Sequence, residues 1–348
     1  MNEVSMVFLK NCWYCAGWSS ELTDKPIGYK MLDQDVVLYR KKDGSVVAVS
    51  GICRHRFAPL ADGKVVDDKI ECPYHGLQYD ETGSCVYNPH GSGKIPPRAD
   101  LESYSVIEKS GAIWIWMGDS EKADASKIPD FDFVSDRENW SGLTGYLRIE
   151  ANYQLVIDNL MDLTHAAYLH PTTVGQSPDA WIGDMKMEHK CFVEGDILTS
   201  DYVFFNSPPT PLLELFTDIE VGDIYTPMIL YPASTMILDM YMTTPKGAKS
   251  EGVAMPSCHF LVPESDNSCH YFYAISRNVK LDDDEITAAM GALVGRAFID
   301  EDALIIKKCQ EAMGNADFFD LKPVILETDI AAVRARRMLQ KMINAEKS

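Results

Sequence analysis

Two short segments of this chain each hold one cysteine and one histidine, and together they restrict its fold more than any other feature. The first is Cys53-Arg54-His55 and the second is Cys72-Pro73-Tyr74-His75, with residues 56–71 between them. Glycines and prolines surround both segments, as tight loops require. Two thiolates and two imidazoles can hold a tetrahedral zinc ion or a [2Fe-2S] cluster, so the sequence predicts a metal site on two loops.

The distribution of these ligands favours the cluster over zinc. Each segment supplies one cysteine and one histidine, so one iron can bind both thiolates and the other iron both imidazoles. Structural zinc sites more commonly pair like residues within one loop. We therefore assign Cys53, His55, Cys72 and His75 to a [2Fe-2S] cluster.

A second set of candidate metal ligands follows about 90 residues later. Asn159, Asp162 and His165 share one stripe of a helix with a 3.6-residue period. His170 leaves that register, and Pro171 after it disfavours a helical conformation at His170. We expect the helix to end there, with His165 and His170 as ligands of a 2-His-1-carboxylate Fe(II) site. A pair of packed core histidines is the alternative.

Length, charge and cysteine content exclude several classes of protein. A chain of 348 residues is expected to form two domains. Its 32 basic and 52 acidic residues give a net charge of −20, which argues against nucleic acid as a partner. Nine cysteines indicate thiols and metal ligands rather than a disulfide framework. We find neither a long apolar run nor a signal peptide, so we expect no membrane contact and a cytoplasmic protein.

Short strand-like runs dominate the first third of the chain. Three pairs of such runs flank turns that contain glycine, namely residues 36–40 with 45–49, 77–79 with 85–87, and 104–107 with 113–116. This spacing predicts a small all-β domain at residues 1–118.

The rest of the chain is mixed in character. Residues 119–140 are acidic and lack periodicity, so we interpret them as a connector. Residues 141–348 combine the helix described above with strand-like runs, for example 228–231 and 259–262, and with helical patterns near the end. We therefore expect an α+β protein with a separate domain at residues 141–348.

The two metal-binding motifs resemble those of a known enzyme family. Cys53-Arg54-His55-Arg56 and Cys72-Pro73-Tyr74-His75-Gly76 look like the Rieske motif. Asn159-x-x-Asp162-x-x-His165-x-x-x-x-His170 looks like the mononuclear iron motif of Rieske non-haem iron oxygenases. Length, Asn11-Cys12-Trp13-Tyr14 and Asn88-Pro89-His90-Gly91 bring the chain close to the oxygenase components of dicamba and vanillate O-demethylases.

The resemblance extends over nearly the whole chain and implies its architecture. An N-terminal Rieske [2Fe-2S] domain of β-strands is followed in this family by a helix-grip catalytic domain, an antiparallel sheet with helices. The family also implies a homotrimer of one subunit type.

The resemblance further implies a third iron ligand, a carboxylate on a later helix. Residues 298–302 form the matching segment, and the family's Glu-Asp pair aligns with Glu301 and Asp302. We choose Asp302 as the ligand. Asp300 is the second choice, and a solvated acidic turn without a metal is the alternative.

Asp162 and Asn159 are expected to belong to the catalytic set. Three residues before His165, the Asp162 carboxylate is placed to accept the second N–H of that imidazole. The resemblance implies that Asp162 also meets His75 of a neighbouring subunit and so connects the cluster with the iron. A carboxylate that only caps the helix is the alternative.

Other candidate residues carry weaker signals. The resemblance points His259 into the substrate cavity, where it would bind a substrate carboxylate, with a core histidine as the equal alternative. Asp239 and Leu293 are expected as cavity walls, and Leu293 departs from the tryptophan of the dicamba enzyme, which puts the same substrate in doubt. Cys12 and Cys15 have the spacing of a redox or zinc half-motif, but we expect them to be structural.

These residues together predict a monooxygenase. Three protein ligands on one face of Fe(II) leave positions for O₂, and a Rieske cluster delivers electrons singly. The resemblance implies electrons from NADH through a ferredoxin or flavin reductase, and O-demethylation of a methoxylated aromatic acid with loss of formaldehyde. Aromatic cis-dihydroxylation is the alternative among enzymes. Outside enzymes, the alternative is a Rieske electron carrier with a non-catalytic second domain.

Overall fold

The structure, a computed structural model, describes residues 8–177 and 186–347 and divides the chain into two compact units. The first unit comprises residues 1–128 with 262–265, and the second comprises 129–261 with 266–348. The main division falls inside the predicted connector, which contains three short 3₁₀ turns. We keep the boundaries 1–118, 119–140 and 141–348 as a proposal.

The first unit contains two antiparallel sheets. The strand order is β1-β10-β9-β4-β3-β2 in one and β5-β6-β7-β8 in the other. The larger sheet is made of β1 (Trp13–Trp18), β2 (Ile27–Met31), β3 (Gln34–Arg40), β4 (Val46–Ser50), β9 (Ser103–Lys109) and β10 (Ala112–Trp116). The smaller sheet is made of β5 (Lys64–Val66), β6 (Lys69–Glu71), β7 (Gln78–Tyr79) and β8 (Cys85–Tyr87). The all-β prediction for this part is confirmed.

Each of the three predicted strand pairs is present in the first unit. Strand β3 pairs with β4, β7 with β8, and β9 with β10. Local interactions stabilise the turn between β3 and β4. The Asp43 carboxylate there accepts the backbone N–H of Ser45 at 2.9 Å. Gly44 supplies the positive φ of +88° that this turn needs.

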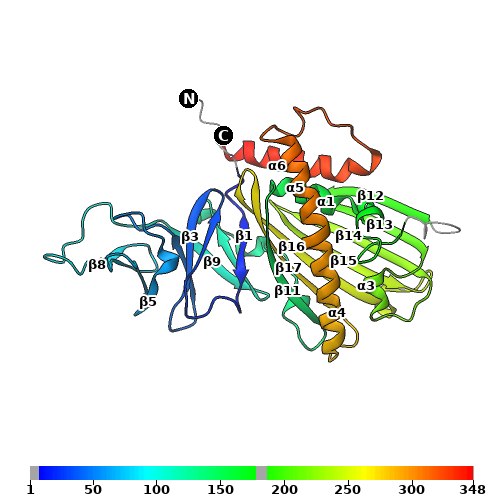
Figure 1. The fold of residues 1–348 in the computed structure, drawn as a ribbon, viewed down its shortest axis with the longest axis horizontal. Helices are drawn as coiled ribbons and strands as arrows, with labels where there is room; N and C mark the ends of the chain where they lie inside the picture. Colours follow the sequence, from blue (N-terminus) through cyan, green and yellow to red (C-terminus); the bar gives the residue numbers. More distant parts are fainter. Residues whose placement is uncertain (1–7, 178–185, 348) are drawn as a thin grey trace. The chain divides into compact units, whose positions relative to one another are not determined.

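The second unit is built on a seven-stranded sheet with helices (Figure 1). Its strand order is β11-β17-β16-β15-β14-β13-β12. The strands are β11 (Ser141–Ile149), β12 (Lys186–Glu194), β13 (Ile197–Ser207), β14 (Gly222–Tyr231), β15 (Thr235–Thr243), β16 (Val253–Ser265) and β17 (Ser268–Arg277). The strand-like runs expected at 228–231 and 259–262 lie in β14 and β16, and the α+β fold class is confirmed.

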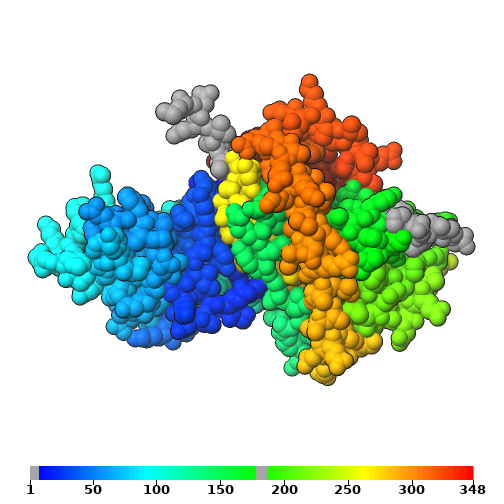
Figure 2. All heavy atoms as spheres, viewed as in Figure 1, coloured from blue at the N-terminus to red at the C-terminus, as the bar shows by residue number. Residues whose placement is uncertain are grey.

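One interrupted helical segment crosses this sheet. It consists of α4 (Asp284–Gly295), the π-helical η8 (Arg296–Asp302) and α5 (Ala303–Met313). Figure 2 shows it in orange on the surface of the second unit. A π-helical stretch inserts backbone into an α-helix, which re-aims the side chains that follow, and such stretches are frequent at functional sites.

A break divides the helix that was expected to carry Asn159, Asp162 and His165. Helix α1 (Tyr153–Met161) ends at Asp162, whose φ of −118° and ψ of 92° are not helical. A 3₁₀ turn, η5 (Leu163–His165), and the short α2 (Ala166–Leu169) follow. The expectation of one continuous helix is therefore wrong, because the Asp162 carboxylate caps a new turn by accepting the Thr164 N–H at 3.0 Å. The expected end at His170 is confirmed.

The C-terminal helix α6 (Ile330–Glu346) is fixed to α1 by a half-buried ion pair. The Arg336 guanidinium contacts both carboxylate oxygens of Asp158, with Nε at 3.0 and 2.9 Å. A bidentate pair of this kind fixes orientation as well as distance. It therefore fixes the helix that precedes the predicted iron ligands. Among the described residues, every helix is too short or too polar to cross a membrane.

Candidate metal centres and substrate cavity

The two cysteine-histidine segments form matching loops in the first unit. In one loop the Cys53 carbonyl accepts the N–H of Phe57, and in the other the Cys72 carbonyl accepts the N–H of Gly76, at 3.0 and 3.1 Å. Phe57 and Gly76 both have positive φ, +58° and +70°. Each loop therefore turns back four residues after its cysteine. The histidine in between lies at the same end of the loop as the cysteine.

These loops present two buried sulfurs and two outer imidazoles. Cys53 and Cys72 are buried, whereas His55 is exposed and His75 is half-buried, and the two imidazole rings lie 4.5 Å apart between centroids. The Tyr79 hydroxyl lies 3.2 Å from the Cys53 sulfur. Burial raises the pKa of the Cys72 thiol, so a bound metal is needed to stabilise the thiolate there.

A buried nitrogen shows that these residues fit a metal cluster. Within the described chain, Nδ1 of His75 is buried and has no hydrogen-bond partner. Such a nitrogen is costly to bury unless something binds it, and a metal ion is the natural partner of an imidazole nitrogen between two loops that carry thiols. Cys53, His55, Cys72 and His75 are the residues that would hold the [2Fe-2S] cluster.

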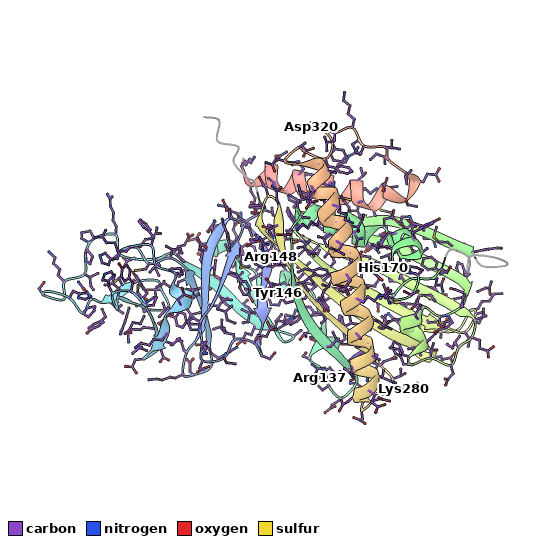
Figure 3. The ribbon with its side chains drawn as sticks, in the orientation of Figure 1. Arg137, Tyr146, Arg148, His170, Lys280 and Asp320 are labelled. Atoms are coloured by element: carbon purple, nitrogen blue, oxygen red, sulfur yellow. The ribbon has the colours of Figure 1, made fainter. Side chains whose placement is uncertain are left out.

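The second candidate centre brings together His165, His170 and Asp302. Their candidate ligand atoms all lie within 4.8 Å of one another. Oδ1 of Asp302 is 3.0 Å from Nε2 of His170 and 3.7 Å from Nε2 of His165. Figure 3 shows His170 beside the α4–α5 segment that carries Asp302. Asp300, the second choice for the carboxylate, is exposed.

The donor types and spacing of this group fit an Fe(II) ion. Two imidazoles and one carboxylate converge from one side, which is the arrangement of the 2-His-1-carboxylate sites. Burial lowers the pKa of His165, which favours the neutral ring that binds metals. Burial acts in the same direction on His170, but hydrogen bonds to Asp302 and Glu301 outweigh it and raise its pKa.

Hydrogen bonds from neighbouring residues orient all three candidate ligands. Nδ1 of His170 lies 2.7 Å from Oε2 of Glu301, and the same oxygen accepts the Thr173 hydroxyl at 2.8 Å. The Asn159 amide donates to Oδ1 of Asp302 at 3.0 Å. Outer partners of this kind fix the tautomer and the ring orientation of metal-binding histidines.

Asp162 orients His165 through its backbone rather than its side chain. Nδ1 of His165 lies 2.5 Å from the Asp162 carbonyl oxygen. The Asp162 carboxylate instead accepts hydrogen bonds at Oδ1 from the hydroxyls of Thr164 and Tyr202, at 2.6 and 3.2 Å. This corrects the expectation that the carboxylate accepts the ring N–H. The cause is the helix break, which turns the carboxylate toward Thr164.

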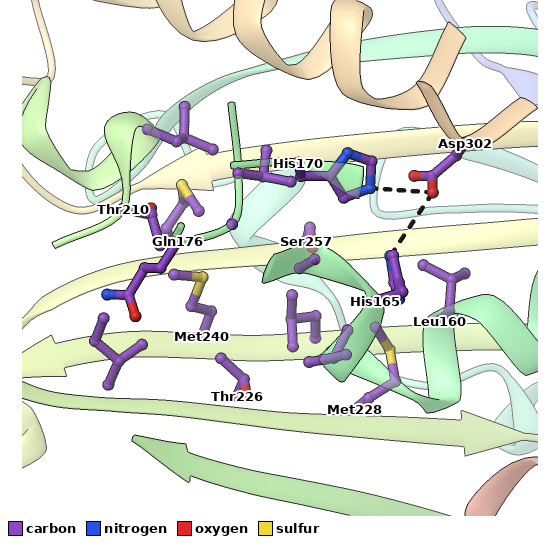
Figure 4. Close-up of a pocket in the computed structure, with 18 of the residues that line it drawn as sticks. Leu160, His165, His170, Gln176, Thr210, Thr226, Met228, Met240, Ser257 and Asp302 are labelled. Carbon is purple, nitrogen blue, oxygen red and sulfur yellow. Dashed lines mark hydrogen bonds and ion pairs between the residues drawn. The ribbon is translucent and has the colours of Figure 1, made fainter. Parts of the chain in front are cut away.

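A cavity of the second unit opens directly on the candidate iron ligands (Figure 4). The space inside its outline, open solvent at its mouth included, is about 970 Å³. His165, His170 and Asp302 form one side of the cavity, and most other wall residues are apolar. Met228 of β14 and Leu238 and Met240 of β15 are examples.

His259 lies in the cavity wall, but its ring is fully engaged within the protein. Nε2 lies 2.9 Å from the Ser257 hydroxyl and Nδ1 lies 2.6 Å from the Tyr271 hydroxyl. The residue is 2% exposed, and burial lowers the pKa of His259 to about 3. The imidazole is therefore neutral at ordinary pH.

Asp239 and Leu293 are not among the residues that line this cavity. Alternate residues of a strand face opposite sides, so Leu238 and Met240 face the cavity while Asp239 faces away and pairs with Lys249. Leu293 lies on α4, away from the cavity lining. This corrects the expectation that the two residues form cavity walls.

Cys12 and Cys15 lie in the core of the first unit. Both are buried, and Cys15 belongs to β1. Burial raises the pKa of Cys15 strongly, so its thiol stays protonated. This burial agrees with the expectation that Cys12 and Cys15 are structural residues.

Sequence reasoning missed three residues that contact the candidate ligands. Glu301 and Thr173 hold His170, and Tyr79 contacts Cys53. Glu301 carried a detectable signal, because it directly precedes Asp302 in a helical segment. The other two are brought to their partners by tertiary folding alone.

Comparison with known proteins agrees with this geometry. Residues 12–105 match the family "Rieske [2Fe-2S] domain", and residues 149–345 match the family "Vanillate O-demethylase oxygenase C-terminal domain". The oxygenase component of dicamba O-demethylase from Stenotrophomonas maltophilia is 34% identical, over 98% of this chain and 99% of the relative.

Two further comparisons cover nearly the full chain. The oxygenase component of chloroacetanilide N-alkylformylase from Rhizorhabdus wittichii is 33% identical, over 98% of this chain and 97% of the relative. The crystal structure of dicamba monooxygenase bound to dicamba superposes with a TM-score of 0.90 at 34% identity, covering 98% of this chain and 99% of that one.

We predict that Asp302→Ala removes the mononuclear iron and leaves the cluster intact, because the two ligand sets share no residue. Unaltered protein should hold about three irons and two acid-labile sulfides per chain, two of the irons in the cluster. The variant should hold one iron fewer and keep its visible spectrum. Asp300→Ala is the matched control and should keep all the iron. The reverse pattern would place the third ligand at Asp300.

We also predict that Glu301→Ala weakens Fe(II) binding by about 10–100-fold, since His170 loses the carboxylate that orients it. Glu301→Gln keeps a hydrogen-bonding side chain but removes its charge. Its Fe(II) affinity should therefore lie between those of the unaltered protein and Glu301→Ala. Titration of iron-depleted protein with Fe(II) measures the effect, with Glu285→Ala, an exposed glutamate of α4, as control. Equal affinity in all four proteins would contradict the orienting role.

Proposed function

Because the chain belongs to the Rieske non-haem iron oxygenases, as an oxygenase component of the O-demethylase type, we propose that it removes a methyl group oxidatively from a methoxylated aromatic compound. The observation that carries this proposal is the cavity whose wall contains His165, His170 and Asp302. A ligand in this cavity lies against the candidate iron ligands. The relatives of this chain support the proposal, since they include the oxygenase components of dicamba and vanillate O-demethylases.

The overall reaction balances with one O₂ and two electrons. The ether R–O–CH₃, O₂, two electrons and two protons give R–O–CH₂OH and water, and the hemiacetal then breaks into R–OH and formaldehyde. When bound, the [2Fe-2S] cluster and the Fe(II) ion supply single-electron transfer and O₂ activation. We propose NADH as the electron source, through a flavin reductase with or without a ferredoxin.

The residues of this chain position the reacting groups. His165, His170 and Asp302 would hold the iron at one side of the cavity, and Glu301 and Asn159 keep His170 and Asp302 in place. The rest of the cavity wall is mostly apolar and offers water few hydrogen-bond partners. A pure electron carrier needs neither the three converging ligands nor a cavity beside them, so this arrangement favours an enzyme.

We propose that the working unit is a cytoplasmic homotrimer in which Asp162 meets His75 of the next subunit. The family resemblance supports the trimer. The side chain of Asp162 supports the contact, because its hydrogen bonds within the described part of the chain all reach Oδ1, which leaves Oδ2 as an acceptor. Asp162 is half-buried and therefore accessible to a partner.

The reaction class is tested by incubating the protein with O₂, NADH, a reductase and a panel of methoxylated and plain arenes. We expect formaldehyde in a one-to-one ratio with the phenol product. A matched protein, His165→Ala, should release none, because it lacks an iron ligand. Formation of dihydrodiols without formaldehyde would show that the protein is a ring dioxygenase instead.

The trimer contact is tested by mixing two inactive chains. His75→Ala lacks a working cluster and His165→Ala lacks the iron site, so each alone should be inactive. Mixed trimers contain interfaces that pair an intact cluster with an intact iron site, and part of the activity should return. Adding Asp162→Ala to the His75→Ala chain should abolish this recovery while both metals stay bound. Inactive mixed trimers of verified composition would contradict transfer between subunits.

A further inference from the structure

The cavity beside His165, His170 and Asp302 has no cationic wall. None of the described residues that line it is a lysine or an arginine. The residues that the structure does not describe, 1–7, 178–185 and 348, contain no lysine, arginine or histidine either. This chain therefore supplies no fixed positive charge to the cavity apart from the metal site itself.

The histidine of the wall does not replace such a charge. Both ring nitrogens of His259 already have hydroxyl partners, Ser257 and Tyr271, and the ring is fully buried. A carboxylate of a ligand would have to displace one of these partners and would still meet a neutral ring. Burying a carboxylate without a cation or several N–H donors is strongly unfavourable.

The remaining polar groups of the cavity are neutral, and two of them, Thr226 and Gln176, face a ligand as acceptors. Thr210 accepts the backbone N–H of Leu213 at 3.3 Å and keeps its single O–H as a donor. The Thr226 hydroxyl donates its hydrogen to the Tyr202 carbonyl at 3.0 Å, so its lone pairs remain. The Gln176 amide nitrogen donates to Ser207 and to the Pro208 carbonyl. Because a carbonyl only accepts, Nε2 must face Pro208, and Oε1 remains as an acceptor.

These neutral groups lie away from the candidate metal ligands. Figure 4 shows Gln176 and Thr210 on the far side of the cavity from His165, with Ser257 between. A ligand whose methoxy group faces the metal site therefore directs its other end toward Gln176. An N–H or O–H at that end matches the acceptor, whereas a carboxylate would meet the carbonyl oxygen of Gln176 with like polarity.

We propose that this cavity selects an uncharged aromatic ether that carries a hydrogen-bond donor at the end remote from the metal site, and that it rejects the corresponding carboxylate. The proposal rests on the proposed O-demethylation and names its substrate class. It replaces the aromatic acid that the sequence resemblance implies.

The test compares binding of matched pairs to the metal-loaded protein by calorimetry. Each pair consists of a methoxybenzamide and the methoxybenzoate with the same substitution. We expect the amide to bind tighter by on the order of 100-fold. Equal or tighter binding of the acid, or no binding of any amide, overturns the proposal.

Two variants with a matched control test whether the lack of a cation in the cavity wall causes the preference for the amide. Gln176→Arg places a cation at the far end of the cavity, and it should reverse the preference and favour the acid. Met240→Lys does the same at a second point of the wall, in case the first variant folds poorly. Gln176→Met removes the acceptor without adding charge, so it should weaken the amide about tenfold without strengthening the acid. An unchanged preference in both cationic variants contradicts the proposal.

A formaldehyde assay on the same pairs separates this proposal from the proposed function. Amides that bind but release no formaldehyde, with no formaldehyde from any acid, overturn O-demethylation and leave the charge preference standing. Acids that bind tighter and release formaldehyde overturn the charge preference and leave O-demethylation standing.

Discussion

The candidate iron site of the second unit depends on the contacts of the Asp302 carboxylate. A single oxygen of this group lies 3.0 Å from both the Asn159 amide and Nε2 of His170, and 3.7 Å from Nε2 of His165. It therefore joins helix α1, the segment after it and the long helical segment of residues 284–313, which are far apart in sequence. A carboxylate buried among imidazoles is stable only if it stays paired, so these segments must be in place before the site exists.

Two irregular elements of backbone make this contact possible. The break at Asp162 turns His165 out of the register of α1 and lets the Asp162 carbonyl hold its ring. The π-helical stretch that ends at Asp302 re-aims the helix, so that Glu301 reaches one nitrogen of His170 and Asp302 the other. Regular helices at both places would separate these groups. The irregularity thus lies where the chemistry requires side chains from several segments to meet.

The sequence predicted the local features better than the distant ones. The ligands of each motif are a few residues apart, and the hairpins have explicit turn residues, so both could be predicted from neighbouring residues. Asp302 lies more than 130 residues from His170 and was identified only through the family resemblance. The role of Glu301, the direction of the Asp162 carboxylate and the outward face of Asp239 depend on tertiary packing or on a local break. No periodic pattern records these features.

We expect the cluster and the iron site, both encoded in this one chain, to act together in a single oxygenation. A single-turnover experiment shows whether they do. Protein with its cluster reduced is freed of reductant and mixed with O₂ and a bound methoxyarene, and formaldehyde and the visible spectrum of the cluster are followed together. We predict formaldehyde up to the amount of mononuclear iron, with oxidation of the cluster at the same rate. Formaldehyde release while the cluster stays reduced would show that the iron site works without electrons from the cluster.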